Sequence, residues 1–171
     1  MERRTIHRVL LGAILFSVVW GASGWAKPRF IRRLSATKTP AAEPIRWQPD
    51  LKTAQRVAQE TGRPMLIVMG GDRCTYCKKL EAETLGDVST ATYINTSFVP
   101  VHLHWERDQR AAQILEVKAL PTCVILSPEA DLLGSVEGFV KPPEFTRLLH
   151  QSLDFQRKLQ SEKESTAGFD R

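Results

Sequence analysis

Two cysteines spaced as C-x-x-C, Cys74 and Cys77, are the residues of this sequence best suited to chemistry. They follow the apolar run 65–69 after a short Gly-Gly-Asp-Arg turn. A run of this kind predicts a buried strand, and the residues after the turn predict a helix. Two thiols at such a strand–helix junction indicate thiol–disulfide chemistry.

The sequence leaves two other interpretations of the pair open. An inert structural disulfide is one, because small exported domains use such bonds for stability. A metal site is the other, and it would recruit His102 and His104, which alternate onto one face of a predicted strand. Two thiolates and two imidazoles would supply four ligands, although an ordinary packed side chain is the simpler interpretation of each histidine.

Alternating helix and strand signals surround the cysteines. Runs of apolar residues predict strands at 65–69, 98–104, 122–126 and 132–139. Helical periodicity and capping residues predict helices at 51–61, 74–85, 88–95, 109–117 and 142–160. Helical connections between the first three strands predict that these are parallel, and the short turn before the fourth predicts an antiparallel edge strand.

The net charge of +5 comes from the N-terminal part of the chain. The first 45 residues hold eight of the 24 Lys and Arg residues and two of the 19 Asp and Glu residues, which leaves 16 basic and 17 acidic residues from 46 onward. A nearly neutral domain without a basic stripe predicts no nucleic-acid partner.

The N-terminus is predicted to be an export leader. Residues 1–8 are basic and residues 9–26 carry no charge, which is the layout of a cleaved signal peptide. A run of about 18 uncharged residues also reaches the lower limit for a membrane-spanning helix, so 9–26 could remain as a membrane tether. Either outcome predicts a periplasmic or other extracytoplasmic domain, which an uncleaved leader would anchor to the inner membrane. The predicted parts are therefore the leader (1–26), a basic proline-containing linker (27–46), the folded domain (47–160) and a disordered polar tail (161–171).

The order of the elements carries a family resemblance. With C-x-x-C at the first strand–helix junction and Leu120-Pro121-Thr122 before the third strand, residues 47–150 resemble the thioredoxin superfamily. They are similar to secreted thioredoxin-like domains, such as the C-terminal domain of the membrane electron transporter DsbD. The resemblance implies an α/β thioredoxin-like fold, in which helices flank a central mixed sheet of about four strands and the active site lies at the first strand–helix junction.

The resemblance also implies roles for single residues. Cys74 would be the solvent-facing thiol that attacks a disulfide, and Cys77 the buried thiol that resolves the mixed disulfide. A helix N-terminus favours the thiolate at Cys74, in agreement with that assignment. Pro121 aligns with the cis-proline that lies against the dithiol in this family. The residues expected to border the substrate groove are Pro121, Thr122, Thr75 and Tyr76.

The sequence departs from the best-known members at two positions. Val68 stands where they carry a buried aspartate that accepts a proton, and Arg73 replaces the tryptophan before the first cysteine. Arg73 is expected to stabilise the Cys74 thiolate. The missing acid leaves proton removal from Cys77 without an obvious acceptor. Glu81, four residues later on the same helix face, could substitute, although a solvated carboxylate is the simpler interpretation.

These observations predict an extracytoplasmic thiol–disulfide oxidoreductase that acts on protein thiols and disulfides and exchanges electrons with a membrane or periplasmic redox partner. No organic cofactor and no metal are expected. The Thr-Tyr pair between the cysteines matches neither the Gly-Pro of cytosolic reductants nor the Pro-His of strong oxidants, so the direction of electron flow stays open. Cys123 is expected to be a core side chain, although an odd cysteine could also pair between chains. The alternative function is a metal-handling or non-catalytic binding module that uses the same cysteines.

Overall fold

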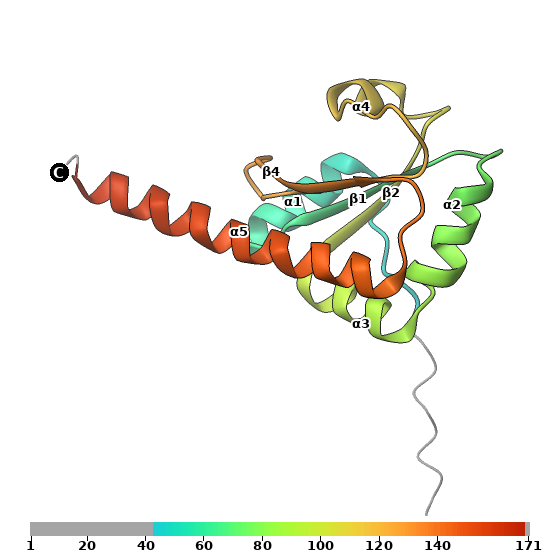
Figure 1. The fold of residues 1–171 in the computed structure, drawn as a ribbon. Helices are drawn as coiled ribbons and strands as arrows, with labels where there is room; N and C mark the ends of the chain where they lie inside the picture. The colour runs from blue at the N-terminus through green and yellow to red at the C-terminus, as the bar shows by residue number, and fades with distance from the viewer. Residues whose placement is uncertain (1–42, 170–171) are drawn as a thin grey trace, which may run out of the picture. The chain divides into compact units, whose positions relative to one another are not determined.

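The computed structural model describes residues 43–169, with side chains described up to residue 165 (Figure 1). The predicted leader and most of the predicted linker lie outside this range. Within it, no helix is both long enough and apolar enough to cross a membrane. The elements in chain order are α1 (Leu51–Thr61), β1 (Met65–Gly70), α2 (Thr75–Leu80), the π-helix η1 (Glu81–Leu85), α3 (Val88–Ser97), β2 (Val99–His104), α4 (Gln109–Ile114), β3 (Thr122–Leu126), β4 (Leu132–Glu137) and α5 (Pro142–Phe169).

The four strands form one mixed sheet in the order β2-β1-β3-β4. Strand β1 pairs with β2 in parallel, and β3 is antiparallel to both β1 and β4. The prediction of an antiparallel fourth strand at the sheet edge is confirmed, and so is the mixed four-stranded sheet flanked by helices. The prediction that the first three strands are parallel is wrong for β3.

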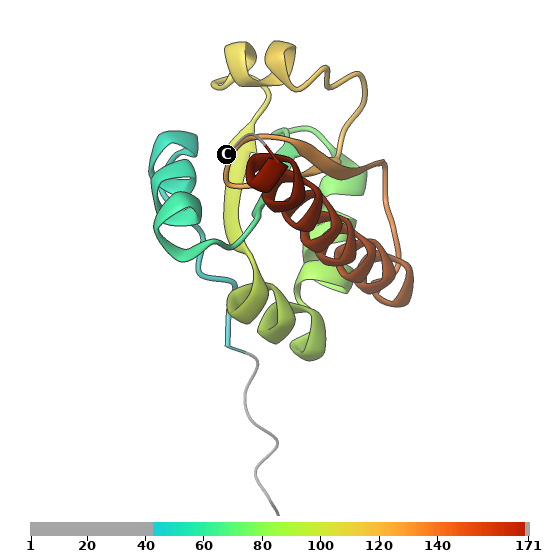
Figure 2. The ribbon, with the colours of Figure 1, turned by 90° about the vertical axis from the view of Figure 1, so that its left-hand side faces the viewer.

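The connection between β2 and β3 explains the difference. Helix α4 has six residues, which gives it a length of about 9 Å, less than half the length of a six-residue strand. It therefore cannot carry the chain back along the sheet. Figure 2 shows α4 beyond the end of β2. Because β3 is antiparallel to β1, and β1 is parallel to β2, β3 begins at that same end of the sheet. Glu116, at φ 52°, ends the helical segment there, and the chain re-enters the sheet in the opposite direction.

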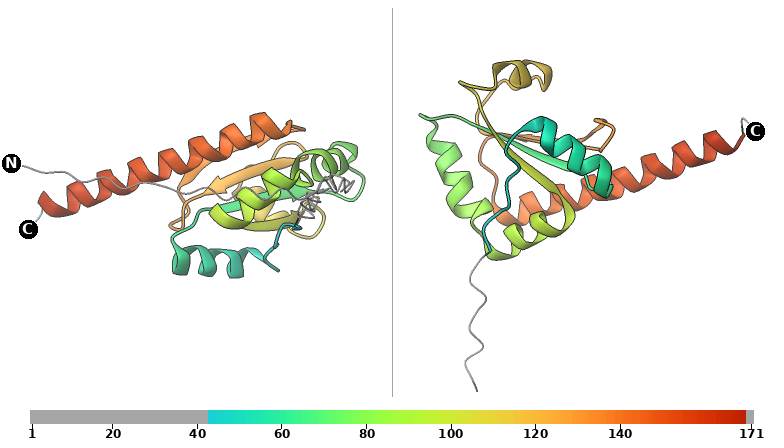
Figure 3. Two further views of the ribbon diagram at one scale, coloured as in Figure 1. Left: turned by 90° about the horizontal axis from the view of Figure 1, so that it is seen from below. Right: turned by 180° about the vertical axis from the view of Figure 1, so that it is seen from behind.

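Helices cover both faces of the sheet (Figures 2 and 3). Two apolar clusters hold them there. On one face, Ala54 and Ala58 of α1 pack on Met65, Ile67 and Met69. On the other face, α2, η1, α3 and α5 cover Leu66 and Val68. That cluster is built from Leu66, Val68, Leu80, Leu85, Ile94, Phe98, Cys123, Ile125, Phe145 and Leu149, among others. The alternation of side chains along β1 thus assigns Val68 and Gly70 to the face covered by α2.

The ends of the folded part lie outside the predicted limits of 47 and 160. Before Trp47, Ile45 packs against the core, and the Asn95 side chain hydrogen-bonds both the Arg46 N–H and the Pro44 carbonyl. Helix α5 continues past Ser161 to Phe169, where the sequence predicted a disordered tail. The added turns contain strong helix formers, and Lys163 donates to Asp131 at 2.8 Å beside β4.

Candidate active site

Cys74 and Cys77 form a disulfide at the start of α2, with an S–S distance of 2.07 Å and a Cα–Cα distance of 5.2 Å. Cys74 is the N-cap of α2, and its Sγ accepts the N–H of Cys77 at 3.0 Å. Cys74 is partly exposed, whereas Cys77 is only 4% exposed. A solvent-borne thiol or disulfide therefore reaches Cys74 and not Cys77.

The turn before Pro121 lies beside the turn that carries the cysteines. The Leu120–Pro121 peptide bond is cis, as the resemblance implies. A Cβ added at Gly71 would lie only 2.9 Å from Leu120 Cδ1, so glycine is what allows the two turns to approach. The Pro121 carbonyl accepts the Gly138 N–H at 2.7 Å, which ties this turn to the end of β4.

The side chains expected to border a groove differ in exposure. Tyr76 is 62% exposed, and Thr75 and Arg73 are also exposed beside Cys74. Thr122 is 3% exposed, and its hydroxyl donates to the Ala119 carbonyl, so its side chain faces inward and only its backbone can serve a groove. Next to Leu120 the surface has a hollow of about 310 Å³, lined by Trp105, Lys118, Ala119 and Leu120.

Comparison with known proteins identifies the family. Residues 51–153 match the family described as thioredoxin-like domain. The chain belongs to the thioredoxin-like family. Its fold is similar to that of the DsbH oxidoreductase (TM-score 0.61, 16% identity, 71% of this chain and 92% of that one). It is also similar to a thioredoxin from Thermus thermophilus (TM-score 0.59, 26% identity, 64% and 87%). A third similar structure is a putative disulphide-isomerase from Bacteroides thetaiotaomicron (TM-score 0.57, 19% identity, 66% and 95%).

A sequence relative is found in an animal. An uncharacterized protein of Caenorhabditis elegans is 29% identical over 83 residues, which are 46% of this chain and 11% of that protein. The match therefore spans a small part of a much larger protein.

The thioredoxin-like domain places an imidazole beside its buried cysteine. Val68 pairs with His102 of β2, and Gly70 with His104. A Cβ at Gly70 would lie 3.1 Å from His102 Nε2 and 3.9 Å from Cys77 Cβ, so the imidazole edge and the cysteine flank the same point. Glu81, the first residue of η1, places a carboxylate oxygen 3.5 Å from His102 Nε2.

The sequence alone does not connect Glu81 with His102, nor either histidine with Cys77 in a redox role. The signal that could have connected them is the strand register: with the two strands parallel, Val68 pairs with His102. The i to i+4 spacing of Cys77 and Glu81 then brings the carboxylate to the same side.

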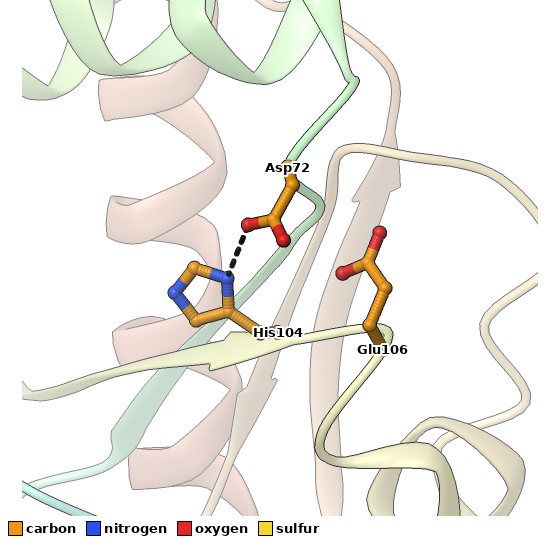
Figure 4. Close-up of side chains that lie close together, drawn as sticks. All are labelled: Asp72, His104 and Glu106. Atoms are coloured by element: carbon orange, nitrogen blue, oxygen red, sulfur yellow. Dashed lines mark ion pairs between the residues drawn. The ribbon is translucent and has the colours of Figure 1, made fainter.

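A second polar cluster surrounds the turn before Cys74 (Figure 4). Asp72, His104 and Glu106 bring one potential metal-ligand atom each within 4.8 Å of one another, and His104 Nδ1 lies 3.7 Å from Asp72 Oδ1. The carboxylates are exposed, and the cluster contains neither Cys74 nor Cys77. His104, one of the two histidines that the alternative metal site would recruit, thus has its Nδ1 next to Asp72.

Cys123 is fully buried in β3, between Val68 on β1 and Val136 on β4. Burial raises the pKa of this thiol to about 12. It is the third cysteine of the chain and packs as a core side chain, as the sequence predicts.

Proposed function

We propose that this protein is an extracytoplasmic thiol–disulfide oxidoreductase that exchanges disulfides with protein substrates through Cys74 and Cys77. The observation that carries the proposal is the unequal exposure of two bonded cysteines at one helix N-terminus. Cys74 is open to attack and Cys77 is buried within bonding distance of it, which is the arrangement that thiol–disulfide exchange requires.

Exchange proceeds by nucleophilic attack between sulfur atoms. The Cys74 thiolate attacks a substrate disulfide, one substrate sulfur leaves as a thiolate that takes a proton from solvent, and a mixed disulfide remains. The Cys77 thiolate then attacks Cys74 Sγ, which forms the Cys74–Cys77 disulfide and releases the second substrate sulfur. The reverse sequence oxidises a substrate dithiol. The N–H of Cys77 on Cys74 Sγ stabilises the thiolate in both directions.

Exposed side chains around Cys74 support a polypeptide as substrate. Tyr76, which lies between the two cysteines, is exposed, and Trp105 lines the hollow beside Leu120, which leaves room for a substrate side chain. The Pro121 turn offers backbone groups to an extended chain. Arg73, exposed one residue before Cys74, is placed to favour the thiolate by its charge.

A trapping experiment tests the exchange. In the Cys77→Ser variant the mixed disulfide cannot be resolved, so Cys74 should retain a substrate protein that non-reducing electrophoresis separates and mass spectrometry identifies. Cys74→Ser is the matched control and should trap nothing. Equal trapping by the two variants, or none by either, would contradict the proposal and leave the binding-module alternative.

A glutathione titration of the same disulfide determines the direction of electron flow. A potential near about −270 mV would mark a reductant, and one near about −120 mV an oxidant. The extracytoplasmic location rests on the leader predicted at 1–26. Fusion of the full chain to alkaline phosphatase tests it, because the reporter should be active only when residues 1–26 are present.

A further inference from the structure

An imidazole, that of His102, lies on the same side of the sheet as the buried Cys77, across Gly70. Val68, 1% exposed, occupies the position of the missing acid, and its neighbour on the same face of the sheet is His102. Cys77 approaches this face from α2. Gly70 lies between the two, and because it has no side chain, the space that joins His102 Nε2 to Cys77 stays open.

The Nε2 atom of His102 is buried and has no hydrogen-bond partner among the described residues. A buried polar atom without a partner is costly unless it has a task or a partner in another state. Glu81 Oε1, at 3.5 Å, is close enough to stabilise a proton on Nε2 without already bonding it. The pair can therefore gain an interaction when the imidazole becomes charged.

Burial lowers the pKa of His102 below its ordinary value of 6.5, and the Glu81 carboxylate opposes that effect. The other charged or titratable groups that face the imidazole are His104 and Arg107, which favour the neutral ring, and Asp108, which favours the charged ring. The imidazole is consequently neutral near pH 7, and the neutral ring is the form that can accept a proton.

A solvent route leads away from the pair. His102 and Glu81 line a surface hollow of about 480 Å³, together with Trp47 and Leu85. The Trp47 ring lies 5.5 Å from the His102 ring and covers part of it. A proton taken up at Nε2 can therefore leave through Glu81 to water without passing the substrate at Cys74.

We infer that His102 is the proton acceptor for the Cys77 thiol and that Glu81 stabilises the resulting imidazolium. This inference rests on the proposed thiol–disulfide exchange. In the resolving step the Cys77 S–H gives its proton to His102 Nε2, directly or through one water. The Cys77 thiolate then attacks Cys74 Sγ, forms the Cys74–Cys77 bond and displaces the substrate sulfur, which leaves as a thiolate and takes a proton from solvent. In the reverse direction the imidazolium returns a proton to Cys77.

A two-step reaction with dithiobis(nitrobenzoate) tests the inference in the reduced full-length chain. Attack by Cys74 releases one coloured thiolate, and resolution by Cys77 releases the second, so stopped-flow absorbance separates the steps. Buried Cys123 does not contribute on this timescale. In His102→Gln the first phase should keep its rate, whereas the second should slow at least about 10²-fold and lose the limb of its pH profile that reports the imidazole.

Two further variants keep the test decisive. Glu81→Gln removes the charge that raises the pKa of His102, so the same limb should move to lower pH, a change that a merely structural role of Glu81 would not cause. His150→Gln, which changes a histidine of α5 that bonds Tyr93, is the matched control and should leave both phases unchanged. If His102→Gln does not fold, the Glu81→Gln profile decides.

The outcomes separate the inference from the function on which it rests. A wild-type chain that releases no coloured thiolate would overturn the proposed exchange itself. A wild-type chain with two phases, whose second phase has the same rate and pH profile in His102→Gln and Glu81→Gln, would overturn only the role of His102.

Discussion

Leu80 anchors the helix that carries Cys77, and its truncation should cost several kcal/mol. The side chain is fully buried, and its neighbours come from the sheet, α3 and α5, which cannot close in on a vacated site. Leu80→Ala removes three carbon groups at about 0.8 kcal/mol each, a transfer loss of about 2.4 kcal/mol. The cavity left behind raises the expected loss in free energy of unfolding to about 3–4 kcal/mol.

Urea unfolding followed by circular dichroism measures this loss, because a lower midpoint with an unchanged slope reports stability alone. Leu132→Ala is the matched control, since Leu132 on edge strand β4 is 59% exposed and the same truncation should cost at most about 1 kcal/mol. Equal losses in the two variants would refute the argument that α2 is held by this packing.

Three further changes test other contacts. Thr84→Val removes the hydroxyl that donates to the buried Val140 carbonyl at 2.5 Å, and the unpaired carbonyl should lower the free energy of unfolding by about 1–3 kcal/mol in the same urea assay. Asp87→Ala removes the N-cap carboxylate that accepts the Thr90 N–H at 2.8 Å, and the free energy of unfolding should fall by about 1 kcal/mol. An unchanged free energy of unfolding would show that α3 does not depend on this cap. Burial lowers the pKa of His102, so the unfolded chain binds a proton below pH 6.5 that the folded chain binds only at lower pH. Thermal melts should therefore show stability falling below that pH, more steeply in the wild type than in His102→Gln.

The sequence predicted the elements better than their directions. Gly62 and Pro64 separate α1 from β1, and Asp87 marks the start of α3, so these boundaries follow from local backbone preferences. The direction of β3 does not, because it depends on where the chain between β2 and β3 lies in space. The apolar pattern at 109–117 predicts a longer helix than α4, and nothing local shows that its last residues turn away at Glu116.

The local part of the candidate site could be predicted from the sequence, and the part contributed by another strand could not. The spacing of Cys74 and Cys77 identifies the dithiol, because the chemistry requires both thiols within one helical turn. The partner of Cys77 could not be found in this way. His102 comes from another strand, and its relation to Cys77 depends on the register of β1 and β2 and on the absence of a side chain at Gly70.

Because Cys123 is buried, its reactivity can report local opening of the central sheet. The thiolate is the form that attacks an alkylating reagent, and this thiol is both enclosed by β1 and β4 and protonated in the native state. Alkylation at Cys123 therefore requires β3 to separate from the sheet, and its rate measures how often that happens. Mass spectrometry of one sample can then follow two alkylation reactions. Cys74 and Cys77 are alkylated once their disulfide is reduced, and Cys123 is alkylated once the central sheet opens. A bound substrate that lowers the alkylation rate of Cys123 would show that binding at the active site stabilises the central sheet against opening.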